Sequence, residues 1–159
     1  MPIQNSPGLS IVLADDDLDD CLLFQEALNE LQGSFSLTIV NDGDRLMKLL
    51  KDRQDALPEM IFLDINMPRK NGVDCLIEIK GNNLISHIPV VIFSTSFEPS
   101  LVERLYNIGA NHYIQKPSGF YSLTQVLLLA INIILKERSA KPTADQFVLF
   151  PSEYEDKKI

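Results

Sequence analysis

Short apolar segments alternate with longer segments of helical periodicity along this chain, and this alternation constrains the fold most strongly. The predicted strands are rich in Val, Ile and Phe: Ser10–Ala14, Ser36–Val40, Met60–Leu63, Val90–Phe93 and His112–Gln115. The predicted helices span about Leu18–Leu31, Asp44–Arg53, Val73–Lys80, Ser100–Ile108 and Tyr121–Arg138. Several strands are apolar at every position, which is typical of strands buried on both faces of a parallel sheet.

Five successive strand–helix units predict a parallel sheet with helices on both faces. Crossovers between parallel strands are right-handed, so the natural small solution is a doubly wound, flavodoxin-like α/β fold with five strands in the order 2-1-3-4-5. We predict that this domain covers residues 9–138, between an N-terminal tail at 1–8 and a C-terminal tail at 139–159. The expected helix caps are Asp17 and Asp44 at N-termini and Gly109 at a C-terminus.

The bulk properties of the chain exclude several classes of protein. A length of 159 residues suits one domain, and we expect no standard DNA-binding output module, because the predicted C-terminal tail is too short for one. The net charge of -8 repels phosphate backbones, so nucleic acid is not an expected partner. The N-terminus lacks the features of a signal peptide, and the longest apolar run falls short of the ~20 residues that span a bilayer. We therefore expect a cytoplasmic protein without membrane insertion, whose Cys21 and Cys75 are reduced and buried.

The last predicted helix, Tyr121–Arg138, is apolar around almost its whole middle. A single stripe that faces a sheet cannot bury so many apolar side chains. Because exposed apolar patches usually mark interfaces, we expect this helix to contribute to a homodimer or to a partner surface. The alternative is that the apolar segment Phe147–Phe150 folds back and covers the helix.

Functional groups follow four of the predicted strands. Asp15 and Asp16 come after the first strand, Asp64 after the third, Ser94 after the fourth and Lys116 after the fifth. In the predicted order, the first and fourth strands flank the third, so all of these groups meet at the carboxyl edge of the sheet. Open α/β sheets bind their ligands at this edge.

Three clustered carboxylates repel one another unless some are protonated or a cation lies among them. Oxygen ligands of this kind suit Mg²⁺, which can also bind a phosphoryl group and offset the charge that develops during its transfer. Asp64 could then act as a nucleophile towards phosphorus. Lys116 would supply a positive charge, and Ser94 a hydroxyl donor, to the phosphoryl oxygens.

A calcium loop is a competing interpretation of the first acidic segment. Asp15, Asp17 and Asp19, with Glu26 in the twelfth place, have the spacing of an EF-hand loop. The sixth position of such a loop is Gly, whereas Asp20 stands here, and the preceding segment is a predicted strand rather than a helix. Acidic residues on the first turn of a helix, where they favour its positive N-terminus, explain the pattern better.

Taken together, these motifs resemble the response regulator receiver domain of two-component phosphorelay signalling. The resemblance covers most of the chain, and four motifs carry it: Leu13–Asp17, Leu63–Pro68 with Gly72, Ile92–Thr95 and Lys116–Pro117. It implies that Asp64 is the phosphoacceptor and that Asp16 and Asp64 ligate Mg²⁺, joined by the backbone carbonyl of Asn66. Asp15 would act mainly through bound water.

The same resemblance assigns the remaining roles. Ser94 is the switch hydroxyl, Lys116 is the lysine that contacts the phosphoryl group, and Tyr113 is the switch aromatic. In the family, the hydroxyl moves towards the phosphoryl group and the aromatic ring turns inward. The Lys116–Pro117 bond is expected to be cis, an isomer that only proline makes readily accessible.

The chain is also similar to the stand-alone receivers that serve bacterial phytochromes and other sensor or hybrid histidine kinases. The expected partners are therefore such a kinase and a histidine phosphotransfer protein. As a receiver, the chain is expected to have no enzyme activity beyond self-phosphorylation and autodephosphorylation. The haloacid-dehalogenase-type phosphatases use similar groups, but they need an Asp where Asn66 stands. A receiver-like scaffold that binds partners without phosphorylation is the second alternative.

Overall fold

The computed structural model describes residues 8–137 and 141–151, and these form one sheet flanked by two layers of helices. The strands are β1 (Leu9–Ala14), β2 (Phe35–Val40), β3 (Met60–Leu63), β4 (Val90–Ser94), β5 (His112–Gln115) and β6 (Val148–Leu149). The helices are α1 (Leu18–Glu30), α2 (Gly43–Asp52), α3 (Gly72–Lys80), α4 (Pro99–Ile108) and α5 (Phe120–Glu137), with a short 3-10 turn at Ala144–Gln146. Each predicted strand and helix is present.

All neighbouring strands pair in parallel, and the sheet order is β2-β1-β3-β4-β5-β6. The predicted order of the first five strands is confirmed. The sheet has six strands rather than five, because Val148 and Leu149 pair with Tyr113 and Ile114 at the β5 edge. Part of the predicted C-terminal tail is therefore integrated into the sheet.

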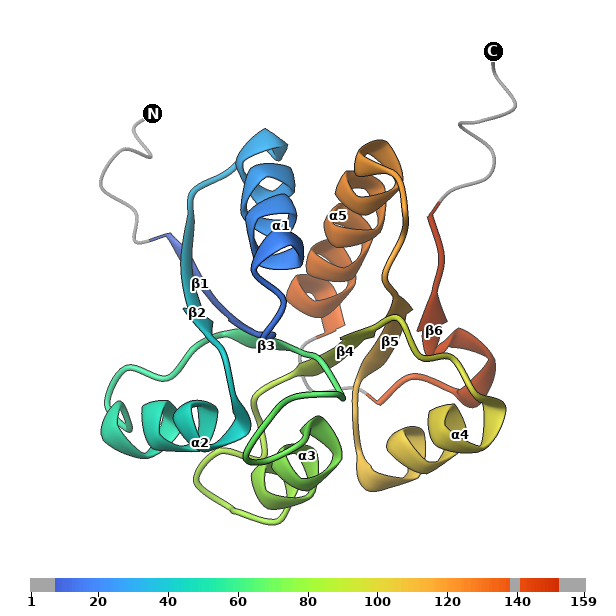
Figure 1. Ribbon diagram of the computed structural model, residues 1–159. Coiled ribbons are helices and arrows are strands. Elements are labelled where there is room, and N and C mark those ends of the chain that lie inside the picture. The colour runs from blue at the N-terminus through green and yellow to red at the C-terminus, as the bar shows by residue number, and fades with distance from the viewer. Residues whose placement is uncertain (1–7, 138–140, 152–159) are drawn as a thin grey trace.

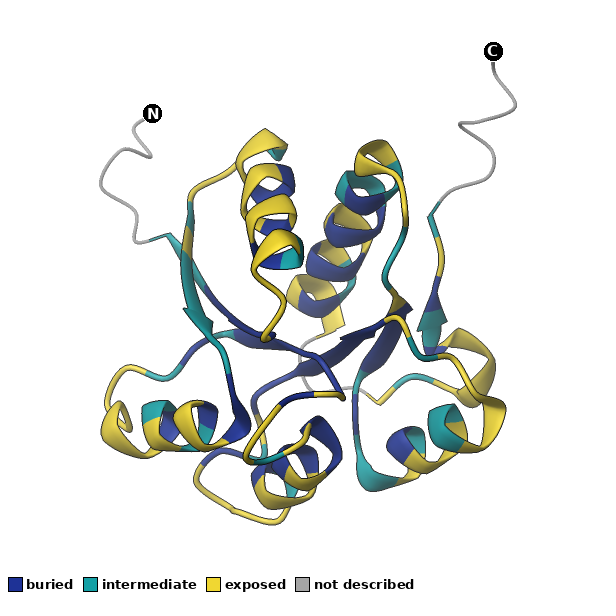
Figure 2. Ribbon diagram, viewed as in Figure 1, coloured by how far each residue is buried: buried dark blue, intermediate teal, exposed yellow. Residues whose placement is uncertain are grey.

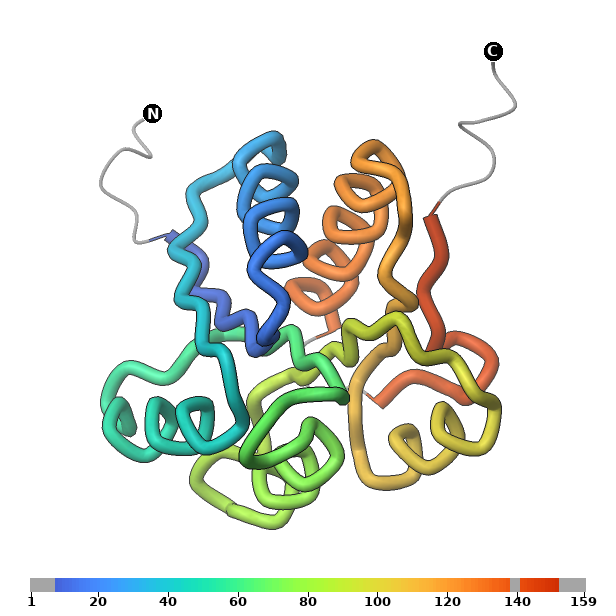
Figure 3. Tube along the Cα trace, viewed as in Figure 1, coloured from blue at the N-terminus to red at the C-terminus, as the bar shows by residue number. Residues whose placement is uncertain are grey.

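Helices α1 and α5 cover one face of the sheet, and α2, α3 and α4 cover the other (Figures 1 and 3). Successive strand residues alternate between the two cores. Phe62 joins the core beneath α1 and α5, whereas its neighbours Ile61 and Leu63 join the core on the opposite face. Strands β3 and β4 are buried along their whole length (Figure 2), which accounts for their continuously apolar sequences.

Two of the three predicted helix caps are confirmed. Asp17 caps α1 by accepting a hydrogen bond from the Asp20 N–H at 3.0 Å, and Gly109 ends α4 with a φ of 126°. The prediction for Asp44 is wrong, because α2 begins at Gly43 and Asp42 accepts the capping hydrogen bond from the Arg45 N–H at 2.8 Å. Asp44 lies in the first turn of the helix instead.

The apolar C-terminal segment folds back, but it packs on the edge of the sheet rather than over the outer face of α5. Phe147 and Leu149 are buried in the two cores. On α5, Leu128, Leu129 and Leu135 remain 38–43% exposed. The expectation that this segment covers the last helix is therefore wrong for the exposed leucines.

Helix α5 combines core positions with an apolar composition. By length and composition alone it could cross a membrane, since its 18 residues have a mean hydropathy of 1.3. In this structure, side chains such as Val126, Leu127 and Ala130 are buried against the sheet and α1. Core helices of globular domains share these properties, so the composition by itself is weak evidence for a membrane span.

Candidate functional site

The structure brings the acidic groups that follow β1 and β3 together at one edge of the sheet. Carboxylate oxygens of Asp15, Asp16 and Asp64 lie within 4.8 Å of one another. This proximity follows from the register in which Ala14, the last residue of β1, pairs with Leu63, the last residue of β3. The predicted juxtaposition of these three carboxylates is present.

The three carboxylates differ in their exposure to solvent. Asp15 is fully buried, Asp64 is almost fully buried and Asp16 is exposed. Burial raises the pKa of Asp15 to about 6, although the Lys116 ammonium and the Asp17 N–H oppose the increase. One side of the cluster is thus desolvated, and the other side is open to water and ligands.

The donor set suits a hard divalent cation. Three carboxylates can each offer one oxygen, and ions such as Mg²⁺ prefer oxygen ligands. Asp15 Oδ2 is buried, and its partner among the residues that the structure describes is Lys116. Its 2.7 Å contact with Lys116 Nζ is an ion pair. A cation between the carboxylates would offset the mutual repulsion of Asp15, Asp16 and Asp64.

Lys116 supplies the positive charge of the site. Its Nζ lies 2.7 Å from Asp15 Oδ2, 2.8 Å from Asp20 Oδ2 and 3.3 Å from Asp64 Oδ2. Burial alone would lower the pKa of this lysine, but its contacts with Asp15 and Asp20 and the charge of Asp64 raise the pKa above its ordinary value. The side chain is therefore a protonated ammonium at neutral pH.

The loop that follows β3 fixes the Asp64 carboxylate. Asp64 Oδ1 accepts a hydrogen bond from the Ile65 N–H at 2.8 Å, and the Gly72 N–H closes the loop by donating to the Ile65 carbonyl at 2.8 Å. Oδ2 is directed to Lys116. Asn66, also in this loop, is exposed, and its side-chain amide donates to Ser96 Oγ at 3.3 Å. The role of its backbone carbonyl as a metal ligand stays a prediction.

Ser94 and Tyr113 contact the same segment after β4. Ser94 is buried, and its Oγ accepts a hydrogen bond from the Ser96 N–H at 3.2 Å. The hydroxyl of the buried Tyr113 donates to the Ser96 carbonyl. Ser96 therefore links the two residues predicted to form the switch. Burial, together with the charges of Asp64 and Glu98, raises the pKa of Tyr113 to about 12, so the phenol is neutral.

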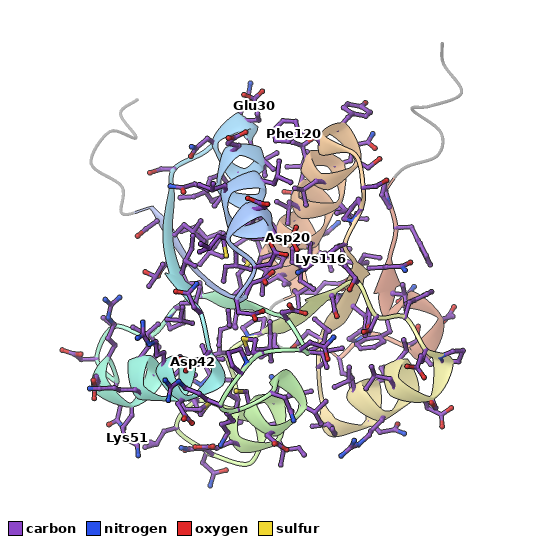
Figure 4. All side chains as sticks on the ribbon, viewed as in Figure 1. Asp20, Glu30, Asp42, Lys51, Lys116 and Phe120 are labelled. Atoms are coloured by element: carbon purple, nitrogen blue, oxygen red, sulfur yellow. The ribbon has the colours of Figure 1, made fainter. Side chains whose placement is uncertain are left out.

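Sequence reasoning missed the parts played by Asp20 and Ser96. Asp20 was expected only to favour the helix N-terminus, whereas its carboxylate contacts Lys116 (Figure 4). The spacing from Asp15 and Asp16 is compatible with this contact, because residue 20 lies on the first turn of α1, beside the β1 end. The direction of the side chain cannot be read from spacing alone.

The predicted cis bond between Lys116 and Pro117 is not present. Every peptide bond in the described residues is trans. The Lys116 N–H donates to the Ser94 carbonyl at 2.9 Å, which continues the pairing of β4 with β5. The two isomers of an X–Pro bond differ by only about 0.5–1 kcal/mol, so a Lys-Pro motif does not determine which one is adopted.

Comparisons with known proteins place this chain in a family. Residues 11–128 match the response regulator receiver domain. The chain is 31% identical over 131 residues to response regulator Rcp1 of Synechocystis sp. (strain ATCC 27184 / PCC 6803 / Kazusa), covering 80% of this chain and 89% of Rcp1.

Two solved structures have the same fold. A phosphorylated cyanobacterial phytochrome response regulator, RcpA, superposes with a TM-score of 0.73 and is 30% identical, covering 86% of this chain and 100% of the other. The Mn²⁺-bound form of Rcp1 has a TM-score of 0.71 at 30% identity and the same coverage. The relatives of this chain thus include phytochrome response regulators, and the chain belongs to the response regulator receiver domain family.

Proposed function

We propose that Asp64 accepts a phosphoryl group from a histidine kinase and that this modification changes the surface that the protein presents to its partners. The observation that carries the proposal is the placement of the Asp64 carboxylate between two further carboxylates and the Lys116 ammonium. This arrangement holds a nucleophile beside groups that can neutralise an incoming phosphoryl group. Membership of the receiver family supports it.

The transfer step follows from this arrangement. An Asp64 oxygen forms a bond to phosphorus while the bond between phosphorus and the donor's histidine nitrogen breaks. The nitrogen leaves with the bonding electron pair and is neutralised by a proton from solvent. In this proposal, Lys116 contacts one of the transferred oxygens, and the Ser94 hydroxyl donates a hydrogen bond to another.

We propose Mg²⁺ as the metal, held by Asp15, Asp16 and Asp64 and by the backbone carbonyl of Asn66. When bound, the ion neutralises charge on the transferred phosphoryl oxygens. Support comes from the three carboxylates, each of which can offer one oxygen within 4.8 Å of the others, and from the full burial of Asp15. The Mn²⁺-bound form of Rcp1 shows that a similar protein takes a divalent metal.

The protein acts on its own aspartate and is not an enzyme in the usual sense. A phosphatase with an aspartyl nucleophile uses a second Asp two residues later as general acid, and Asn66 stands at that place. An amide cannot donate and recover a proton in this way. Self-phosphorylation and autodephosphorylation are therefore the activities that we propose.

The proposed partners are a sensor or hybrid histidine kinase and a histidine phosphotransfer protein. The phytochrome response regulators among the relatives favour a bacterial phytochrome as the kinase. We further propose a cytoplasmic location, where such kinases transfer their phosphoryl groups, and a homodimer through α5.

Intact mass spectrometry after treatment with phosphoramidate tests the proposed function. With Mg²⁺, the wild-type chain is expected to gain a single phosphate. Asp64→Asn should gain none, and neither should the wild type without a divalent metal. Asp74→Asn is the matched control, because Asp74 is an exposed carboxylate on the first turn of α3. Absence of an adduct under every condition would favour a scaffold that binds partners without phosphorylation.

A further inference from the structure

The ammonium group of Lys116 is surrounded by more carboxylates than the proposed transfer chemistry requires. It contacts Asp15, Asp20 and Asp64, and the 2.8 Å distance to Asp20 is shorter than the 3.3 Å distance to Asp64. An ammonium has three N–H donors. The three carboxylates therefore occupy the charge and the donors of Lys116 before a phosphoryl group arrives.

Asp20 is not needed for the other tasks in this region. Asp17 is the N-cap of α1, and it accepts the hydrogen bond from the Asp20 backbone N–H. The carboxylates that could hold a metal are Asp15, Asp16 and Asp64, without Asp20. The Asp20 side chain instead reaches across to Lys116, 96 residues away in the sequence (Figure 4).

Of the three carboxylates around Lys116, Asp20 is the one that water can most readily solvate if it leaves the lysine. Its side chain is 31% exposed, compared with 0% for Asp15 and 8% for Asp64. Releasing a buried carboxylate from its cation leaves an uncompensated charge, whereas a partly exposed carboxylate is solvated when it is released. A phosphoryl group on Asp64 can thus take the place of Asp20 at Lys116 with the smallest penalty.

We propose that Asp20 is a positioning residue that competes with the phosphoryl group for Lys116. In the unmodified protein, Asp20 holds the ammonium group, and it releases the group when Asp64 is phosphorylated. The contact therefore lowers the affinity of the site for a phosphoryl group. This inference rests on the proposed function, because it concerns the regulation of the same site.

The test compares Asp20→Asn with Asp19→Asn, which removes the same charge from the same helix turn. Asp19 is exposed and lies outside the set of carboxylates within ion-pair distance of Lys116. Affinity for beryllofluoride, which mimics a phosphoryl group on a carboxylate, is measured with saturating Mg²⁺, together with the rate of phosphorylation by phosphoramidate. Asp20→Asn is expected to raise both by roughly two- to fivefold, the range of a partly exposed ion pair, and Asp19→Asn by less.

A double-mutant cycle separates the proposed role from a general effect of charge or structure. In a Lys116→Gln background, Asp20→Asn should no longer change beryllofluoride affinity, because the group for which Asp20 competes is absent. Asp20→Ser serves if the Asn variant does not fold. Equal effects of Asp20→Asn and Asp19→Asn, or an effect that persists in Lys116→Gln, would overturn the inference. Failure of the proposed function is distinct, because the wild type would then take up no phosphate.

Discussion

The backbone at Gly72 lies directly against the peptide group of the proposed phosphoacceptor. A Cβ atom added at this position would lie 2.2 Å from the Asp64 carbonyl oxygen and 2.8 Å from the Ile65 Cα atom. Both atoms belong to the backbone, so neither can move without moving the loop that fixes the Asp64 carboxylate. At the scale of single residues, the site depends on a missing side chain as much as on the acidic ones.

We therefore predict that Gly72→Ala destabilises the protein by about 1–3 kcal/mol, the usual cost of overpacking, and slows phosphorylation of Asp64. Urea denaturation measures the first effect, and a phosphoramidate time course measures the second. Gly119→Ala is the matched control, because the nearest atom to an added Cβ there is 3.9 Å away. A Gly72→Ala variant as stable as Gly119→Ala would show that the loop relaxes without cost.

Among the site residues, the sequence predicted those whose position the strands determine. Asp15, Asp64, Ser94 and Lys116 lie at or just after strand ends, and the parallel register brings them together. Asp20 was missed because an acidic residue on the first turn of a helix is already explained by its attraction to the positive helix N-terminus. Its contact with Lys116 depends on the position of the residue that follows β5, which the sequence around Asp20 does not reveal.

At the scale of elements, the strands and helices were predictable from periodicity, but their precise starts and the last strand were not. The N-cap of helix α2 is Asp42, two residues before the predicted cap, Asp44. Gly43, the first residue of the helix, lies where a Cβ would be 2.0 Å from the Lys70 carbonyl oxygen. That contact is with a distant part of the chain. Strand β6 has only two residues, too few to show the periodicity of a strand. Its position is determined by pairing with the edge of β5, which is a contact between distant parts of the chain.

His112 contacts the segment that leads into β6. It is 5% exposed, and its Nδ1 lies 3.2 Å from the Phe147 carbonyl oxygen in the segment that leads into β6. Burial lowers the pKa of His112, although backbone interactions with Phe147 and Gln146 and the charge of Glu137 oppose the decrease. The folded protein therefore holds the neutral imidazole.

The lowered pKa of His112 makes the stability of the protein depend on pH. The unfolded chain binds a proton at His112 as the pH falls below about 6.5, whereas the folded protein binds it only at lower pH, so stability falls as the pH decreases through this range. The raised pKa of Asp15, about 6, acts in the opposite direction, because there the folded protein binds the proton first. We predict that His112→Asn loses less stability than the wild type between pH 7.5 and 5.5 in metal-free urea titrations.

His87→Asn is the control for this experiment, because His87 is exposed and lies far from β6 in the sequence. It should lose as much stability over the same range of pH as the wild type does. If the wild type and His112→Asn have the same pH dependence, the buried imidazole is not coupled to folding.

At the scale of the whole molecule, the layer formed by α1 and α5 carries exposed apolar side chains. They are Leu18, Leu22 and Leu23 on α1 and Phe120, Tyr121, Leu128, Leu129 and Leu135 on α5. A groove of about 710 Å³ lies between these helices, lined by residues that include Glu30 and Phe120 (Figure 4). Glu30 is the one charged residue among those that line the groove, so a second copy of the chain could cover the groove and bury mainly apolar and uncharged side chains.

We predict that the protein forms a homodimer whose interface includes α5. Sedimentation velocity should give a mass that rises with concentration from that of one chain, 17.9 kDa, towards that of two. Replacing both Leu128 and Leu129 with Glu should keep the protein monomeric, because a dimer would have to bury unpaired charges. Leu84→Glu should dimerise like the wild type, since Leu84 is 62% exposed but lies in the turns after α3. A wild-type mass that stays at one chain throughout would contradict the dimer and leave the α5 surface for a different partner.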